Sequence, residues 1–406
     1  MSSLTDTTGA RYWRSLDELA RTPEFREAVR REFPDDEWDR LPPATRRQFL
    51  RVMGASLGLA GLTACRWPKE EIVPFAHRPE ERIPGVPQQF ATSLELAGAA
   101  LGVLVTSYDG RPIQVEGNPE HPDRLGAATA VAQAAILGLY DPDRSRRIVF
   151  REAGQEYVKD WDEFASDAAR RFVESAEGVA VLSEASSSSS LLAVKERFLA
   201  TVPGARWYEY EPISRDNERE GLRLAHGRPL RLIPHLDRTR VVACFDADPL
   251  FEHPSAVRLA RQFAASREPH DGAMSRLYVA ESSYTLTGGR ADARRAVQAS
   301  EIAAVLAAVA GRLATDHGIG LPDALVDLPG TGGVDGDFVT AVAADLVAHR
   351  GAGLVMVGPR QAPEVHALAA ALNHALGNVG IGLTYAEDPD PDRPSHAAAI
   401  VELTSA

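Results

Sequence analysis

The fold class of this chain is clearest in residues 238–266, RTRVVACFDADPLFEHPSAVRLARQFAAS. It begins with a short apolar run, which is typical of a strand covered on both faces. A polar loop follows, and apolar residues then recur at the spacing of an amphipathic helix. The stretch therefore predicts a strand, a loop and a helix in the order that α/β proteins use.

The same order recurs along residues 151–406. β-rich runs predict strands at 179–185, 205–212, 238–248, 276–282 and 353–359, and helical runs predict helices at 186–202, 255–266, 301–313 and 364–376. Strands that alternate with helices imply right-handed crossovers. We therefore predict an α/β fold with a largely parallel sheet and flanking helices.

The loop FDADPLFEHP is a candidate metal site. Asp246, Asp248, Glu252 and His253 stand just beyond a predicted strand, where α/β proteins usually bind ligands. Their spacing could hold a divalent cation, but it lacks the ligand order and the glycine of an EF-hand. A polar loop without a metal is the favoured interpretation.

The loop TLTGGRADARR, residues 285–295, is a candidate phosphate site. Gly288, Gly289 and Arg290 could cradle a phosphate, but the stretch is neither a Walker A motif nor a GxGxxG sequence. His366 and His374, eight residues apart on one predicted helix, lack the spacing of a metalloprotease site. We therefore favour the interpretation that both are core or surface histidines with ordinary hydrogen-bond partners, and not metal ligands.

The serine run at residues 186–190 is interpreted as a loop that caps the following helix. No base stands at a spacing that would make one of these serines a nucleophile. Cys244 lies inside an apolar run, which favours a buried structural thiol over a reactive one.

The stretch TRRQFLRVMGASLGLAGLTAC, residues 45–65, resembles a bacterial twin-arginine export signal. Arg46 and Arg47 precede Phe49 and Leu50, and an uncharged run of 13 residues follows. That run makes about 20 Å of helix, whereas a bilayer core is about 30 Å thick. It is too short to span a membrane, and the paired arginines favour an export signal over a buried helix.

Cys65 closes this stretch as the last residue of LTAC. Small residues before a cysteine resemble the lipobox of bacterial lipoproteins, in which the cysteine is acylated and becomes the new amino terminus. The alternative is an ordinary apolar thiol. Directly after an export signal, lipidation is favoured, so that a lipid anchor would hold the chain at the membrane.

Composition narrows the classes of function. The net charge of −13 argues against nucleic acid as a partner. The chain has two cysteines, too few for a four-thiolate iron–sulfur cluster, and no CxxCH motif for covalent haem. These counts argue against a cluster or covalent haem within this segment. We also predict that it carries no catalytic, cofactor-binding or metal-binding residues of its own.

A predicted hairpin carries the resemblance to a known family. GVLVTSY and PIQVEG flank the turn Asp109-Gly110, and the rigid turn GNPEHP follows, with Glu120 and His121 as a weak metal pair. GRPIQVEGNPEHP, then LGLYDPDRS, then DWDEFA resemble the start of molybdopterin oxidoreductases. The cysteines that precede the hairpin in catalytic members with a cluster are missing here, and no motif places a molybdenum ligand.

The order of motifs along nearly the whole chain resembles one branch more closely. An extension with YWRSL and REFP precedes the internal signal, and RPEERIPGVPQQFAT, DADPLFEHPSAVRLARQFA and SRLYVAESSYTLTGGRAD follow it. This order is similar to the iron–sulfur and molybdopterin-like subunit of bacterial alternative complex III, a quinol-oxidising respiratory complex. The resemblance implies a molybdopterin-enzyme fold without molybdenum, with iron–sulfur clusters in a portion beyond this segment.

The resemblance also implies partners and a location. Expected partners are the cytochrome c and quinol-site membrane subunits of the complex, on the outer, periplasmic face of the bacterial cytoplasmic membrane. The alternative is a segment of a genuine molybdopterin-dependent oxidoreductase whose ligands lie beyond residue 406. A third class is a free-standing lipoprotein that binds a small ligand.

The expected organisation has four parts. Residues 1–64 form an extension with the signal, 65–90 a lipobox cysteine with a Pro-rich tether, 91–150 a small β-hairpin region, and 151–406 the α/β portion. The last residues, HAAAIVELTSA, are helical in pattern without a closing strand, so the domain is expected to be truncated at its carboxyl terminus.

Overall fold

The structure is a computed structural model that describes residues 22–32, 83, 85–96, 98–121, 126–174, 178–268, 274–322 and 335–406. The chain divides into two units, Met1–Glu80 and Glu81–Ala406. In the first, helix α2 (Pro23–Glu32) begins after Thr22, whose hydroxyl accepts a hydrogen bond from the Phe25 amide.

The predicted signal residues and the predicted lipidation site Cys65 lie outside the described residues, so these interpretations stay predictions. Among the residues that the structure describes, no helix has the length and apolar character needed to cross a membrane.

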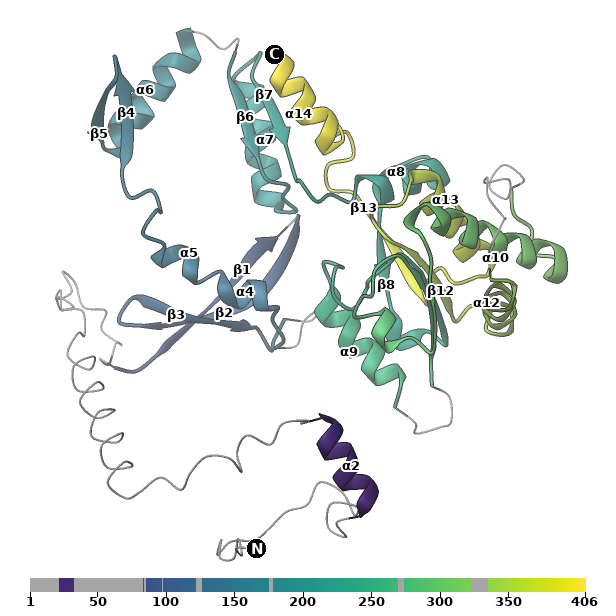
Figure 1. The fold of residues 1–406 in the computed structure, drawn as a ribbon. Coiled ribbons are helices and arrows are strands. Elements are labelled where there is room, and N and C mark those ends of the chain that lie inside the picture. Colours follow the sequence, from purple (N-terminus) through teal and green to yellow (C-terminus); the bar gives the residue numbers. More distant parts are fainter. Residues whose placement is uncertain are drawn as a thin grey trace, which may run out of the picture. The chain divides into compact units, whose positions relative to one another are not determined.

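A four-stranded parallel sheet organises the second unit, in the order β11-β10-β9-β12 (Figure 1). Its strands are β9 (Val241–Phe245), β10 (Arg276–Glu281), β11 (Ala293–Ala296) and β12 (Gly353–Val357). Val241 of the central strand pairs with Arg276 on one side and with Gly353 on the other. The predicted α/β fold with flanking helices is therefore confirmed.

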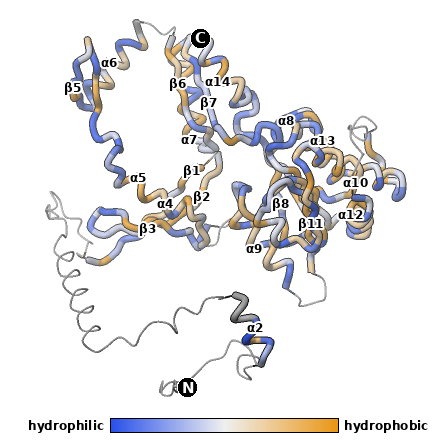
Figure 2. Tube along the Cα trace, viewed as in Figure 1, coloured by the Kyte–Doolittle hydropathy of each residue, from blue (hydrophilic) through white to orange (hydrophobic). Residues whose placement is uncertain are grey.

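Helices cover both faces of this sheet because β9 is apolar on both. Val241, Ala243 and Phe245 pack in one cluster with α10 (Ile302–His317), α12 (Gly336–Ala348) and α13 (Pro363–Ala375). Val242 and Cys244 pack in a second cluster with Leu259 and Phe263 of α9 (Ala256–Ser266). Figure 2 shows the hydrophobic stretches of α10 and α12.

The outer edge of β12 is closed by asparagine side chains. Asn373 of α13 donates from Nδ2 to the Val355 carbonyl at 2.8 Å and accepts from the Val355 amide at 2.9 Å. Asn378 accepts from the Gly353 amide at 3.2 Å. Both side chains are fully buried, and together they satisfy backbone groups that a neighbouring strand would otherwise bond.

An antiparallel pair of strands joins distant parts of the sequence. β8 (Leu230–Pro234) pairs with β13 (Leu383–Glu387). Helix α8 (Asp216–His226) packs against α13 so closely that a Cβ on Gly221 would lie 2.4 Å from the Cβ of His366. Short 3₁₀ turns complete this region, namely η2 (Leu236–Arg238), η3 (Gly288–Arg290) and η4 (Ala299–Glu301).

An antiparallel three-stranded sheet holds the predicted hairpin. Its strands are β1 (Gln88–Leu96), β2 (Ala99–Tyr108) and β3 (Arg111–Gly117). Asp109 and Gly110 both have positive φ, as a two-residue I′ turn requires. Helices α4 (Ala130–Ala134) and α5 (Leu137–Tyr140) follow, and Ala132 of α4 packs on β2 and β3.

The remaining elements form two small groups. In the first group, β4 (Ile148–Glu152) and β5 (Gln155–Lys159) make a hairpin before α6 (Trp161–Glu174). In the second group, β6 (Ala180–Ser183) pairs in parallel with β7 (Arg206–Glu209). Helices α7 (Ser189–Thr201) and α14 (His396–Ser405) lie beside these two strands. Asp160 caps α6, because its carboxylate accepts from the Glu163 amide at 2.8 Å. The parallel strands therefore divide between two sheets instead of one.

Candidate functional site

The two loops weighed as sites in the sequence lie against each other at the carboxyl edge of the four-stranded sheet. One loop, residues 246–255, follows β9, and the other, residues 282–292, follows β10. Asp248 accepts from the Thr287 amide at 3.2 Å and from the Thr287 hydroxyl. The Thr287 hydroxyl in turn accepts from the Leu250 amide at 3.2 Å, so the two loops form one hydrogen-bonded unit.

Asp246 opens the first loop in a left-handed conformation, with φ of +56°. This conformation is costly for a residue with a Cβ, although Asp tolerates it better than most. Its buried carboxylate accepts from the Ser282 hydroxyl at 2.9 Å and from Gln361 Nε2 at 3.1 Å. These bonds hold the backbone where β9 ends.

The strand ends of β9 and β12 meet at the point where the strand order reverses. Open α/β sheets usually bind ligands in the crevice at such a point. Here the Gly358 amide donates to the Phe245 carbonyl at 2.9 Å, and a Cβ on Gly358 would lie 1.8 Å from the Asp246 carbonyl oxygen. Backbone atoms of the chain itself therefore fill this position.

Glu281 occupies the space beneath the glycine-rich loop. It is fully buried and accepts from the Thr285 hydroxyl at 2.6 Å and from Arg294 Nε. A Cβ on Gly288 would lie 1.9 Å from Glu281 Oε1, and the Gly288 amide donates to the Thr285 hydroxyl at 2.9 Å. The glycine makes room for a protein carboxylate, and an amide that a phosphate would use is already bonded.

The four residues weighed as metal ligands have separate partners. Asp246 and Asp248 are bonded as described, Glu252 pairs with Arg360 at 3.3 Å, and His253 Nδ1 accepts from the Ser255 amide at 3.0 Å. Burial, reinforced by nearby arginines, lowers the pKa of His253 well below its usual value. Within the described ranges, no three His, Cys, Asp or Glu side chains come together as a metal site.

Cys244 lies in the core below these loops and is 1% exposed. Burial raises the pKa of its thiol strongly, and the carboxylates of Asp248 and Glu281 act in the same direction. The thiol is therefore protonated and inert at neutral pH, in agreement with a structural role.

His366 and His374 differ although they share α13. His374 is exposed, whereas His366 is 5% exposed and lines a pocket of about 20 Å³ together with Arg215, Glu218 and Met356. Burial lowers the pKa of His366, and its Nε2 has no hydrogen-bond partner among the described residues. The pocket has room for about one water molecule.

Sequence reasoning missed a partner of the serine run. Glu95 of β1 accepts from the Ser186 hydroxyl at 2.6 Å and from the Ser187 amide, across 91 positions of sequence. Burial alone would raise the pKa of Glu95, but these hydrogen bonds outweigh it and lower the pKa. A carboxylate of lowered pKa is a weak base, so the contact holds the loop. Ser188 caps α7, as predicted.

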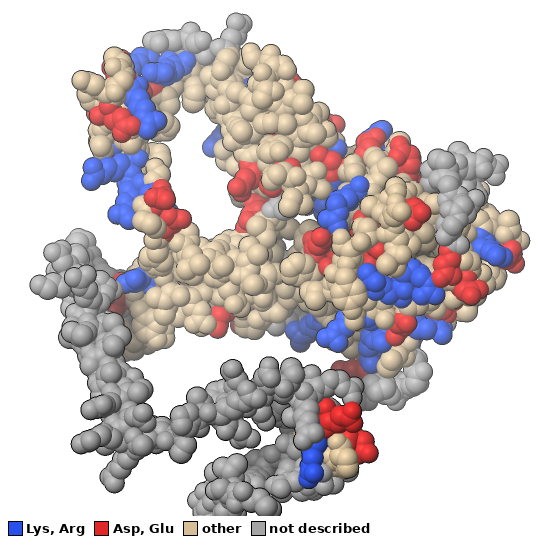
Figure 3. All heavy atoms as spheres, viewed as in Figure 1, with Lys and Arg blue, Asp and Glu red and all other residues tan. Residues whose placement is uncertain are grey.

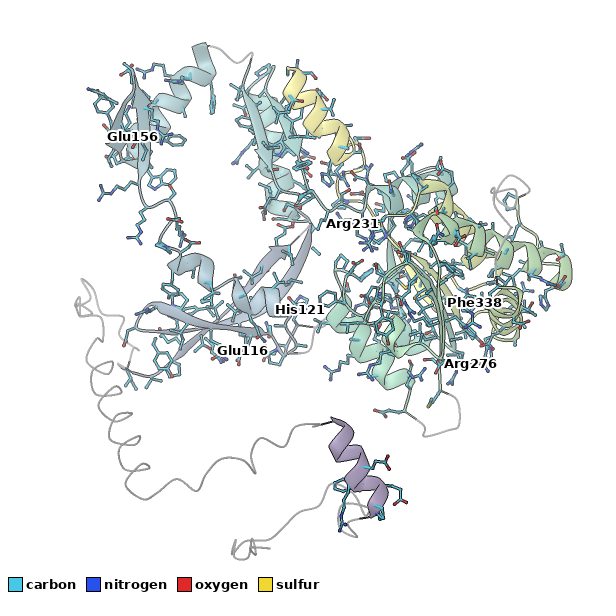
Figure 4. The ribbon with its side chains drawn as sticks, viewed as in Figure 1. Glu116, His121, Glu156, Arg231, Arg276 and Phe338 are labelled. Carbon is cyan, nitrogen blue, oxygen red and sulfur yellow. The ribbon has the colours of Figure 1, made fainter. Side chains whose placement is uncertain are left out.

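The GNPEHP turn is fitted to the three-stranded sheet. Asn118 accepts from the Glu120 amide at 2.9 Å. His121 is labelled in Figure 4, and a Cβ on Gly102 of β2 would lie 2.3 Å from its ring. The close approach of this ring to the strand supports a packing role for His121.

Comparison with known proteins gives one informative likeness. No family model matches the chain. The chain is 32% identical over 123 residues to the menaquinone reductase, molybdopterin-binding-like subunit of Nitratidesulfovibrio vulgaris (strain Hildenborough). That match covers 29% of this chain and 18% of the relative.

A solved structure is also similar in part. It is the formyltransferase/hydrolase complex of Methylorubrum extorquens with methylofuran, matched with 20% identity and a TM-score of 0.38 over 57% of this chain and 58% of that one. The likeness to the molybdopterin-binding-like subunit rests on the 123 matched residues, less than a third of this chain.

Proposed function

We propose that this chain is a non-catalytic, molybdopterin-oxidoreductase-like module of a quinol-oxidising respiratory complex of the alternative complex III kind. The observation that carries the proposal is the likeness, over 123 residues, to the molybdopterin-binding-like subunit of a menaquinone reductase. The order of motifs along the chain supports the narrower assignment.

The carboxyl edge of the sheet supports the non-catalytic part of the proposal. Asp246, Asp248 and Glu281 are buried and bonded to protein donors, and Gly358 brings backbone into the usual ligand crevice. A cofactor at this position would have to displace those contacts. The chain's role is then to position other redox-active parts, not to carry electrons itself.

In this role the module holds an iron–sulfur portion outside this segment against cytochrome c and quinol-site membrane subunits. We place it on the periplasmic face of the membrane, exported by the twin-arginine signal and anchored by a lipid on Cys65. The visible face of the α/β part mixes acidic and basic side chains, which fits protein partners better than nucleic acid (Figure 3).

The test is an analysis of the assembled complex purified from membranes. We expect quinol oxidation, iron in the preparation, no molybdenum by elemental analysis and no pterin fluorescence after oxidative extraction. Stoichiometric molybdenum or pterin would overturn the non-catalytic assignment in favour of a molybdopterin-dependent oxidoreductase. Absence of the chain from any quinol-oxidising assembly would overturn the assignment to a respiratory complex.

A further inference from the structure

Three large apolar side chains project into solvent from the two bonded loops at the carboxyl edge. Phe251 is 67% exposed, Tyr284 75% and Leu286 59%. We call these three residues the apolar edge. Their exposed apolar areas sum to on the order of 300 Å², and contiguous patches of about that size on monomers are often functional.

The backbone under the apolar edge is held by buried polar groups. The Thr287 amide, next to Leu286, is bonded to Asp248, and the Leu250 amide, next to Phe251, is bonded to the Thr287 hydroxyl. Burying carboxylates is costly unless they are fully bonded, and here their bonds join loop to loop. Their effect is to fix the two loops.

Tyr284 is held in a similar way. The Arg294 guanidinium lies 4.6 Å from the centre of its ring, and Arg294 is itself bonded to the buried Glu281. This contact favours one orientation of the exposed ring, and any ordering before binding lowers the entropy lost when a partner covers it. Rigid aromatic side chains are the common anchors of protein–protein interfaces.

The charges around the apolar edge indicate the chemistry of the partner. The loop carboxylates are buried or paired, since Glu252 faces Arg360 at 3.3 Å. Arg290 is exposed and has no ionic partner in the part of the chain that the structure describes. One unpaired cation therefore stands beside the apolar edge, and a carboxylate of the partner is its complement.

We propose that the apolar edge docks a separate protein chain whose surface offers an apolar pocket with a carboxylate beside it. The inference rests on the proposed function only in taking that chain to be a subunit of the respiratory complex. A membrane is the less favoured occupant, because binding to anionic lipid typically uses clusters of about four to eight Lys or Arg. Among the described residues of these two loops, Arg290 is the one cation without an ionic partner.

Site-specific cross-linking in the assembled complex tests the proposal. Tyr284→p-benzoylphenylalanine is irradiated in the complex purified from membranes, and the cross-linked peptide is mapped by mass spectrometry. The control is Trp161→p-benzoylphenylalanine, since Trp161 is 73% exposed on α6. We expect a cross-link from position 284, and none from position 161, to a segment of a different protein chain that carries both apolar and acidic side chains.

Matched substitutions measure the contribution of the surface. Phe251→Ser with Leu286→Ser should lower retention of that partner at least tenfold, whereas Val158→Ser, at a position 62% exposed, should leave it unchanged. Arg290→Glu should weaken retention at low salt, and Arg147→Glu should not. Thermal unfolding checks that each variant is folded.

Cross-links from Tyr284 to lipid, to a second copy of this chain or to another part of the same chain would overturn the proposal. So would undiminished retention by the folded double variant. Neither result bears on quinol oxidation by the complex, so the docking proposal can fail while the proposed function stands. If the chain is not found in a quinol-oxidising complex, the proposed function is contradicted. The cross-link from Tyr284 then still identifies the protein that the apolar edge contacts.

Discussion

Gly358 stands where the ends of β9 and β12 meet, and it has no room for a side chain. A Cβ there would lie 1.8 Å from the Asp246 carbonyl oxygen, so Gly358→Ala must move backbone. We expect a loss of roughly 2 kcal/mol or more in the free energy of unfolding, measured by urea denaturation. Gly311→Ala is the control, because a Cβ there would meet no described atom within 4 Å beyond the nearby backbone of its own helix, α10.

The control should shift stability in the opposite direction. Alanine in a helix is favoured over glycine by about 0.5–1 kcal/mol, so Gly311→Ala should stabilise the protein. Equal destabilisation by both variants would contradict the close approach at the strand ends.

His366 predicts a pH dependence of stability. Burial, the largest influence, lowers its pKa in the folded state, so the unfolded chain binds the proton more readily. The stabilising effect of the neutral ring is present above about pH 6.5 and is lost as the pH falls toward the folded pKa, with a slope of up to about 1.4 kcal/mol per pH unit. His366→Gln should flatten the acid side of the stability profile measured by chemical denaturation.

His374→Gln is the matched control on the same helix, since His374 is exposed. It changes the same residue type outside the core, so a flattened acid slope seen only in His366→Gln assigns the effect to the buried ring. An unaltered acid slope in His366→Gln would show that His366 is not the group responsible.

At the scale of elements, we expect the Asn373 side chain to protect the backbone of β12 from hydrogen exchange more than an exposed side chain of the same helix does. Asn373→Leu leaves the amide and carbonyl of Val355 buried without partners, at a cost of roughly 1–3 kcal/mol for each such group. Hydrogen exchange should accelerate at the Val355 amide before it does at β9. His374→Leu, one position along α13, should leave that exchange rate unchanged.

The elements that were predicted correctly are those whose pattern is local. β9 carries a run of five buried residues, and α9 and α10 show their apolar positions within a few turns. β8 and β13 were not predicted, because their pairing joins Leu230 to Glu387, and neither strand alone shows a strong alternation.

The site was harder to predict than the fold. Each candidate loop contains the residues of a plausible ligand site, and local sequence alone does not show that Asp248 bonds Thr287 or that Glu281 lies under Gly288. These contacts depend on strand order, which places the loops after β9 and β10 side by side. The exposed apolar edge follows from the same arrangement.

At the scale of the whole molecule, export is the first prediction to check. Replacing Arg46→Lys and Arg47→Lys together should leave the protein in the cytoplasm, because a twin-arginine signal is recognised by its receptor and not only by its charge. Cell fractionation measures the outcome, with a general secretory protein as the control. Normal export of the double variant would rule out this signal.

Attachment to the membrane gives a second prediction. Intact mass of the mature protein should show a chain that begins at Cys65 and carries acyl groups. A chain that retains Met1, or one that begins elsewhere without lipid, would contradict lipidation. Cys65→Ala should still assemble if contacts with partner subunits are sufficient to hold the module.

The burial of Cys244 has a consequence for the environments in which the chain folds. A disulfide within the chain would have to join Cys65 to Cys244, because these are its two cysteines, and Cys244 is free and enclosed in the core. Folding of the α/β part therefore requires neither an oxidant nor a reductant. The same native structure can form in the reducing cytoplasm and persist in an oxidising compartment without any thiol exchange.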